Sequence, residues 1–382
     1  REHLRAMLEE ARALERAGLN PQERLSLDLF VFEKERQLAT LALTPVDPQL
    51  LTSWDGLPVR LPRLVAQTPF ASEEDYRNYL ARLNALPAHV DGLIEQLREG
   101  MRSGWTAPKA SVRAVPELLR LLRERVAEGP LAAPLRQIPA SIDSKLRDEL
   151  LVAGLTALNE SVAPALRRLE DFMRSDYLPA ARDSLGASSL PGGPGYYAFL
   201  ARKASGGELT PAELHALGLK EVARIRGAMQ DAIRATGFRG SLPQFLAFAR
   251  SDKRLFASAP EALLGRYRRA IERAGARLPA LFGTIPEDEI GVKRLGQAGG
   301  AGQVAAYYEA GTLERSAALV VNTERLASQP LWEVDTLALH EALPGHHLQV
   351  ARARGLRELP AFRRNGWDDA FGEGWATYAE SL

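Results

Sequence analysis

The sequence contains no cysteine, which excludes disulfide bonds, thiolate metal ligands and a cysteine nucleophile. Lysine is scarce as well, with seven residues against 42 arginines that are spread along the chain. The charges nearly cancel, because 49 Lys and Arg oppose 48 Asp and Glu and leave a formal net charge of +1. We therefore expect no nucleic-acid partner, since nucleic-acid-binding domains normally carry a basic stripe.

No apolar run is long enough to predict a transmembrane segment. Residues 184–201 form a long uncharged stretch, but its prolines and glycines are incompatible with a membrane-spanning helix. We recognise no signal-peptide pattern from Arg1 onward, and because the chain begins with Arg and not Met, we expect any export signal to lie upstream. We expect a soluble protein that is either cytoplasmic or exported under a signal upstream of Arg1.

The organisation predicted from the sequence is two lobes, mainly helical, with one small sheet. A chain of 382 residues exceeds what one core usually supports. Apolar residues recur with helical period through residues 1–183, and Ser72, followed by acidic residues, predicts a helix start. A second lobe is predicted at 184–382, where Thr210 followed by Pro211 starts another helix. Short segments rich in β-branched and aromatic residues predict a sheet, namely EIGVKRL, QVAAYYEAG and SAALVVNT.

Three of the six histidines fall within eight residues, in the segment LALHEALPGHHLQV. The familiar zinc-peptidase pattern is H-E-x-x-H, in which two histidines four residues apart share one helix face and the glutamate acts as general base. Here Glu341 follows His340, but Pro344 occupies the fourth position and the next histidines are His346 and His347.

A straight helix cannot chelate an ion with this spacing. His346 would lie on the face opposite His340, and His347 would lie roughly 10.5 Å further along the axis. Pro344 removes a helical hydrogen bond and Gly345 permits unusual backbone, so we predict that the helix is interrupted here. Such an interruption brings His346 back over His340. We favour His346 as the ligand and keep His347 as the alternative ligand or as a group that faces the substrate.

A third ligand is expected from the downstream segment WDDAFGEGWATYAESL. Glu373 is the favoured residue, because Gly372 and Gly374 on either side allow the backbone to approach another helix closely. Three other carboxylates compete for this role: Asp368, Asp369 and Glu380. Glu380 lies two turns beyond Glu373 on the same face, where it could instead orient a ligating histidine.

The segment HEALPGHHLQ followed by EGWATYAE resembles the bacterial zincin-like proteins catalogued as domain of unknown function 885. Further resemblance lies in LPGGPGYYAFLARKASGGELTPAELHALGLKEVARI, in AAYYEAGTLERSAALVVNTE and in the FRR at 362–364. That family is in turn similar to the helical gluzincin oligopeptidases of the thimet and angiotensin-converting-enzyme types, which have a two-lobed helical body and a small sheet beside the zinc. The resemblance implies one Zn²⁺ per chain, held by His340, His346 and Glu373, with Glu341 as general base. It also implies that family members continue beyond Leu382.

The function implied is zinc-dependent hydrolysis of peptide bonds, with short peptides as substrates. Tyr307 or Tyr308 could stabilise the oxyanion of the reaction, although either could equally pack within the sheet. The strand at 304–310 could pair with an extended substrate, and the run GQAGGAGQ at 296–303 is expected to form a flap. The alternative is a helical binding or scaffold protein that retains a metal site without catalysis. Substrate sequence, mode of cleavage and oligomeric state are open at this point.

Overall fold

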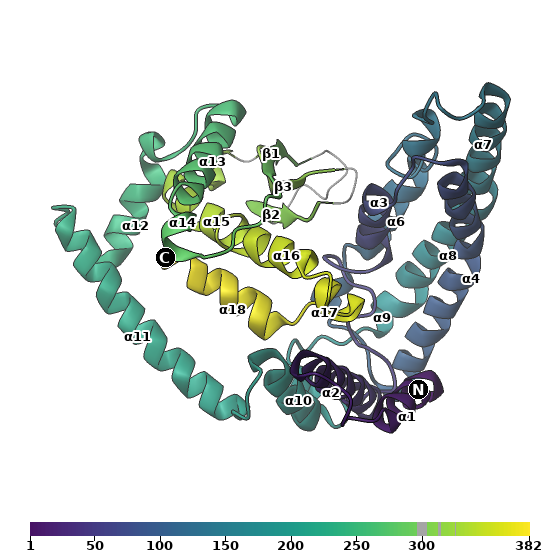
Figure 1. Cartoon of the computed structure of the whole chain (residues 1–382), viewed down its shortest axis with the longest axis horizontal. Coiled ribbons are helices and arrows are strands. Elements are labelled where there is room, and N and C mark those ends of the chain that lie inside the picture. Colours follow the sequence, from purple (N-terminus) through teal and green to yellow (C-terminus); the bar gives the residue numbers. More distant parts are fainter. Residues whose placement is uncertain (296–303, 312–314, 325) are drawn as a thin grey trace. The chain divides into compact units, whose positions relative to one another are not determined.

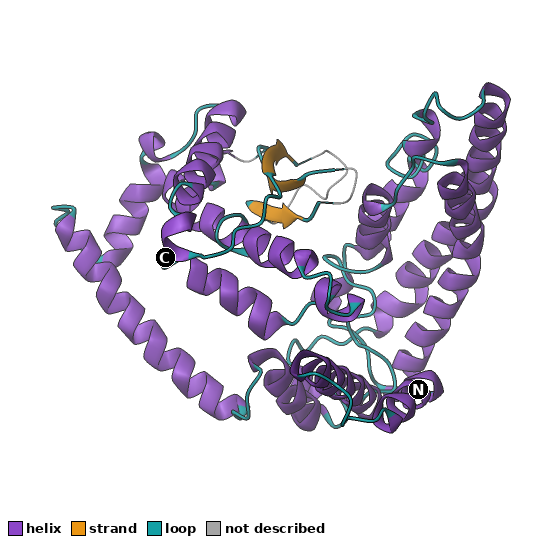
Figure 2. Ribbon diagram, in the orientation of Figure 1, coloured by secondary structure: helices purple, strands orange, loops and turns teal. Residues whose placement is uncertain are grey.

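The computed structural model describes residues 1–295, 304–311, 315–324 and 326–382 (Figures 1 and 2). The described chain is mainly helical with one three-stranded sheet, which confirms the predicted fold class. The flap predicted at 296–303 lies outside the described residues. No described helix has both the length and the apolar character needed to cross a membrane.

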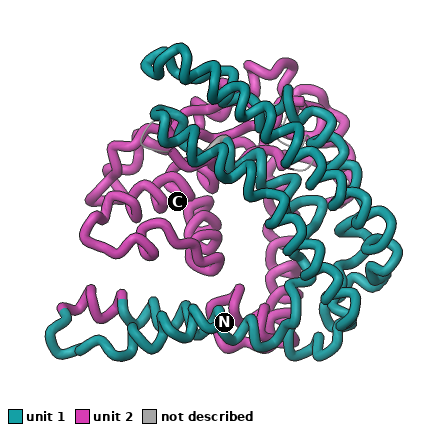
Figure 3. Tube along the Cα trace, turned by 90° about the vertical axis from the view of Figure 1, so that its right-hand side faces the viewer, with its two compact units in different colours: residues 1–19, 27–197, 297–300 teal, residues 20–26, 198–296, 301–382 magenta. Residues whose placement is uncertain are grey.

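The chain divides into two compact units, shown in teal and magenta in Figure 3. Unit 1 is built mainly from residues 1–19 and 27–197, and unit 2 from residues 20–26 and most of 198–382. The lobe boundary between residues 183 and 184 stays a prediction.

Unit 1 is a bundle of helices around an apolar core. The longest helix begins after Ser72, whose side chain and that of Asp75 form the reciprocal capping box expected of this start. Its buried face includes Leu83, Val90 and Leu97, which recur every two turns and pack in the main apolar cluster. The helices are α1 (Glu2–Ala13), α2 (Pro21–Leu43), α3 (Leu57–Gln67), α4 (Glu73–Ser103), α5 (Lys109–Val112), α6 (Val115–Glu124), α7 (Ser144–Ala157), α8 (Ala163–Phe172), α9 (Leu178–Ala180) and α10 (Gly193–Ser205). Two of them belong to both units, because the first residues of α2 and the last residues of α10 fall in unit 2.

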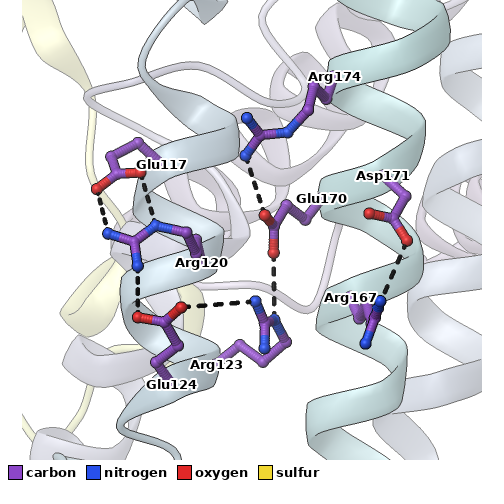
Figure 4. Close-up of polar contacts among 8 residues, drawn as sticks. All are labelled: Glu117, Arg120, Arg123, Glu124, Arg167, Glu170, Asp171 and Arg174. Atoms are coloured by element: carbon purple, nitrogen blue, oxygen red, sulfur yellow. Dashed lines mark hydrogen bonds and ion pairs between the residues drawn. The ribbon is translucent and has the colours of Figure 1, made fainter.

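One buried carboxylate links two helices of this bundle (Figure 4). Glu170 on α8 accepts hydrogen bonds from Arg123 on α6 at 3.1 Å and from Arg174 at 3.0 Å. Its side chain is only 8% exposed, whereas the neighbouring Arg167–Asp171 pair has side chains that are 71% and 65% exposed. Removing a carboxylate from a buried pair leaves a cation without its partner in low dielectric, while exposed pairs contribute little.

Glu170→Ala is expected to lower the free energy of unfolding by about 2 kcal/mol or more, because Arg123 loses its buried partner. Asp171→Ala, one residue further along the same helix, is the matched control and should change it by less than about 0.5 kcal/mol. Urea denaturation followed by circular dichroism measures both. Equal effects of the two substitutions would show that the ion pair between Glu170 and Arg123 does not stabilise the packing of α6 against α8.

Unit 2 carries the remaining helices and the sheet. Thr210 caps α11 with a capping box that includes Glu213, as its sequence predicts. The helices are α11 (Pro211–Ala235), α12 (Leu242–Ser251), α13 (Pro260–Gly275), α14 (Leu278–Leu281), α15 (Val334–Glu341), α16 (His346–Gly355), α17 (Ala361–Asn365) and α18 (Asp369–Ala379). The strands are β1 (Ile290–Arg294), β2 (Ala306–Glu309) and β3 (Ala317–Val321).

The sheet has the order β1-β3-β2, so the wholly buried β3 is central. β3 pairs in parallel with β1 and antiparallel with β2, with Leu319 opposite Tyr308. Leu319 packs in one apolar cluster with Tyr267 of α13 and Ala338 of α15. Burial of this cluster therefore fixes the sheet against the helix that ends in His340 and Glu341, as predicted for a sheet beside that helix.

Candidate metal centre

The helix is interrupted where the Pro-Gly pair predicts an interruption. α15 ends at Glu341, residues 342–345 form a turn that contains a cis Leu343–Pro344 peptide, and α16 begins at His346. The His347 N–H donates to the carbonyl of Ala342 at 3.2 Å, one residue further back than in a regular α-helix. The turn absorbs the extra residues and brings the rings of His340 and His346 to 4.8 Å, centroid to centroid.

Gly345 makes this turn possible by close approach of the backbone. A Cβ at this position would lie 1.8 Å from the carbonyl oxygen of His340 and 2.3 Å from that of Leu339, so no larger residue fits. The turn is held from outside by Trp375 on α18, whose Nε1 donates to the carbonyls of Pro344 at 2.8 Å and Gly345 at 3.3 Å. The role of Gly345 is predictable from its place after Pro344, whereas no local pattern in the sequence predicts the bond from Trp375.

His340, His346 and Glu373 form a group that could hold a metal ion, because one donor atom of each lies within 4.8 Å of the others. The Oε2 of Glu373 lies 3.5 Å from Nε2 of His340 and 3.7 Å from Nε2 of His346. These distances are too long for good hydrogen bonds. They approach the separation of about 3.3 Å between ligand atoms around a tetrahedral ion with bonds of roughly 2.0–2.1 Å. The donor set therefore fits a small divalent cation.

The protonation states suit coordination as well. Glu380 lies 2.8 Å from Nδ1 of His340. Since a carboxylate accepts, Nδ1 carries the proton and Nε2 keeps its lone pair for an ion. This is the orienting role considered for Glu380 in the sequence analysis. Burial lowers the pKa of His346, which favours the neutral ring that binds metals. Among the described residues, its buried Nδ1 has no hydrogen-bond partner.

The other acidic candidates have different positions. Asp368 caps α18 by accepting from the Phe371 N–H at 3.2 Å, and Asp369 accepts from Nε1 of Trp367 at 2.8 Å. Neither belongs to the group of possible ligands. We expected Gly372 and Gly374 to let the backbone approach another helix, and this is wrong. A Cβ at Gly372 would meet the ring of Trp367 at 2.4 Å, and Gly374 faces open space.

Glu341 lies next in the chain to His340 and is held by the sheet. Its Oε2 accepts from the backbone N–H of Tyr308 in β2 at 2.9 Å. Burial raises the pKa of the Glu341 carboxyl, and Glu373 raises it further, while the Tyr308 N–H and His340 oppose the shift. The Tyr308 N–H is thus occupied by Glu341. An extended substrate beside β2 would therefore have to pair with other backbone groups of this strand.

His347 lies outside the group of possible ligands. Its Nε2 lies 2.8 Å from the carbonyl of Asp288 and must donate, so Nδ1 accepts from the Tyr308 hydroxyl at 3.3 Å. Burial lowers the pKa of His347 and raises the pKa of Tyr308 to about 12. The substrate-facing roles expected for His347, Tyr307 and Tyr308 stay predictions. Tyr307 lies in β2 opposite Val320.

A family model described as "Bacterial protein of unknown function (DUF885)" matches residues 1–382. The chain belongs to this family. No curated protein matches this DUF885 chain significantly. Among solved structures, the chain is similar to a "putative lipoprotein from Colwellia psychrerythraea", with a TM-score of 0.88 and 22% sequence identity. The similarity covers 100% of this chain and 68% of that one, and at this identity it shows the fold alone.

Gly345→Ala is expected to abolish tight metal binding, because the added methyl group displaces the carbonyls of Leu339 and His340 and opens the turn. Gly374→Ala is the matched control in α18, where nothing lies within 4 Å of a Cβ. It should bind metal as the wild type does and gain up to about 1 kcal/mol of stability. Titration against a competing chelator measures the affinity, and unchanged binding by Gly345→Ala would refute the role of the turn.

Glu380→Gln is expected to weaken metal binding by about 10- to 100-fold, because an amide polarises the His340 ring less than a carboxylate does. Asp369→Asn is the control, since Asp369 bonds to Trp367 and to no histidine. The same chelator competition distinguishes them. Equal loss in both variants would mean that general damage to α18, and not the bond to His340, governs affinity.

Proposed function

We propose that this DUF885 protein is a zinc-dependent hydrolase that cleaves peptide bonds, with short peptides as substrates. One observation carries the proposal: the half-buried Glu341 carboxylate follows His340 directly and is held by Tyr308 beside the group of His340, His346 and Glu373. Two imidazoles, a carboxylate and an adjacent general base form the constellation expected of a metal-assisted hydrolase.

Zinc is the metal that we propose. Two neutral histidines and one carboxylate suit it, and three protein ligands leave a position open for water or substrate. Manganese, cobalt and iron accept the same ligand types, so metal analysis must decide. When bound, the ion would supply Lewis acidity that activates water and polarises the scissile carbonyl.

The residues of the chain supply the proton transfers. Glu341 accepts a proton from the attacking water and later donates it to the leaving amine. The bond from the Tyr308 N–H orients this carboxylate, and burial makes it a stronger base than an exposed glutamate. Glu380 keeps the proton of His340 on Nδ1 throughout, so that this ring does not compete for the proton.

The outer strand β2 supports an extended substrate. In the described sheet β2 lies at an edge, next to α15, and edge strands pair readily with peptide backbones. Tyr307 and Tyr308 lie in this strand, and either hydroxyl is a candidate donor to the oxyanion. The Tyr308 hydroxyl would have to leave its bond with His347 for that purpose.

Glu341→Gln is expected to keep about one zinc per chain, because the ligands are untouched, and to lose peptide cleavage by about 100-fold or more. Metal content by plasma mass spectrometry and cleavage of a peptide library by mass spectrometry measure the two properties. His340→Ala is the companion variant and should lose both.

Two results would overturn the proposal. Cleavage at the wild-type rate by Glu341→Gln would remove the general base from the mechanism. Zinc binding by the wild type without cleavage of any peptide would favour the alternative, a binding or scaffold protein that retains a metal site.

A further inference from the structure

An aromatic ring borders the group of possible metal ligands. Trp367 lies two residues before α18, and its ring centroid is 5.3 Å from that of His346, at an interplanar angle of 63°. Its six-membered ring also covers Gly372, where a Cβ would come within 2.4 Å of it. Trp367 thus touches one histidine of the group and the backbone next to Glu373.

The orientation of the Trp367 ring is fixed by one hydrogen bond and by its packing over Gly372. Nε1 of Trp367 donates to Asp369 at 2.8 Å, and the missing side chain at Gly372 provides the space for the ring. A ring held in this way loses little conformational entropy when a ligand packs on it. Even so, Trp367 is 48% exposed, so much of its apolar surface is uncovered.

Trp367 lies at the solvent-exposed side of the group formed by His340, His346 and Glu373. The side chains of His340 and His346 are only 19% and 9% exposed, whereas that of Glu373 is 55% exposed. Solvent and ligands therefore reach the group beside Glu373. This is where Trp367 packs against Gly372, the residue preceding Glu373.

We infer that Trp367 forms an apolar subsite for the side chain next to the cleaved bond, which selects peptides with an aromatic or large aliphatic residue at that position. This inference rests on the proposed function. A preoriented indole offers a large apolar contact and favours tilted or edge-on packing of a second ring. A small side chain at the same position would leave the indole surface in contact with water.

The test uses ligands that anchor at the metal without being cleaved. The full chain is loaded with zinc and titrated calorimetrically with N-acetyl-phenylalanine hydroxamate and N-acetyl-alanine hydroxamate. The wild type is expected to bind the phenylalanine compound about fivefold more tightly or better. Trp367→Ala should bring this ratio close to one, and Trp367→Phe should retain part of the preference.

Trp332→Ala is the matched control. Trp332 is 47% exposed and packs edge-on against Phe256 at 6.0 Å, as Trp367 does against His346. It should leave the ratio at the wild-type value. The inference is overturned if Trp367→Ala keeps the preference, if Trp332→Ala abolishes it equally, or if the zinc-loaded chain binds neither compound.

Hydroxamate binding separates this inference from the proposed function. A chain that shows the Trp367-dependent preference but cleaves no peptide retains the subsite and refutes only the hydrolysis. A chain that cleaves peptides but shows no Trp367-dependent preference refutes only the subsite.

Discussion

The close approach of Gly345 to the carbonyls of Leu339 and His340 is the constraint on which the candidate metal centre depends. A regular helix would direct His346 away from His340, because six residues correspond to about one and two-thirds turns. The four-residue turn between α15 and α16 cancels that rotation. Only a residue without a side chain allows the backbone to fold so tightly, and the indole N–H of Trp375 donates to the carbonyls of Pro344 and Gly345 at the end of the turn.

The groups around this turn are each fixed by a different part of unit 2. α18 supplies Glu380 to His340, β2 supplies the Tyr308 N–H to Glu341, and the loop before β1 supplies the Asp288 carbonyl to His347. A single helix with free side chains would leave these rings and carboxylates in several rotamers. The small sheet therefore positions residues of the candidate centre, because it packs on α15 through the cluster of Leu319 and Ala338 and its strand β2 bonds directly to Glu341.

Unit 1 is stabilised by a different balance of interactions. Its apolar cluster is larger than that of unit 2, whereas the group of possible metal ligands found among the described residues lies in unit 2. In this unit the buried Glu170 pairs with the partly exposed Arg123, and Figure 4 shows the neighbouring pairs of charged side chains beside it. The pair between Glu170 and Arg123 links α8 to α6.

The sequence by itself determined most of the helices, the three strands and the residue types of the candidate centre, but not α10, which lies in a Gly- and Pro-rich segment. Periodic apolar residues and local caps such as Ser72 and Thr210 act within a few residues, so they can be read without tertiary contacts. The Pro-Gly pair likewise predicts an interruption. Only the tertiary structure decided that His346, and not His347, faces His340, and that Glu380, Asp368 and Asp369 have separate tasks. The positions of these side chains depend on the residue at which α16 begins and on contacts with Trp375, Tyr308 and Asp288. Those partners lie about 30 to 60 residues away, and their distances are set by packing that no local pattern encodes.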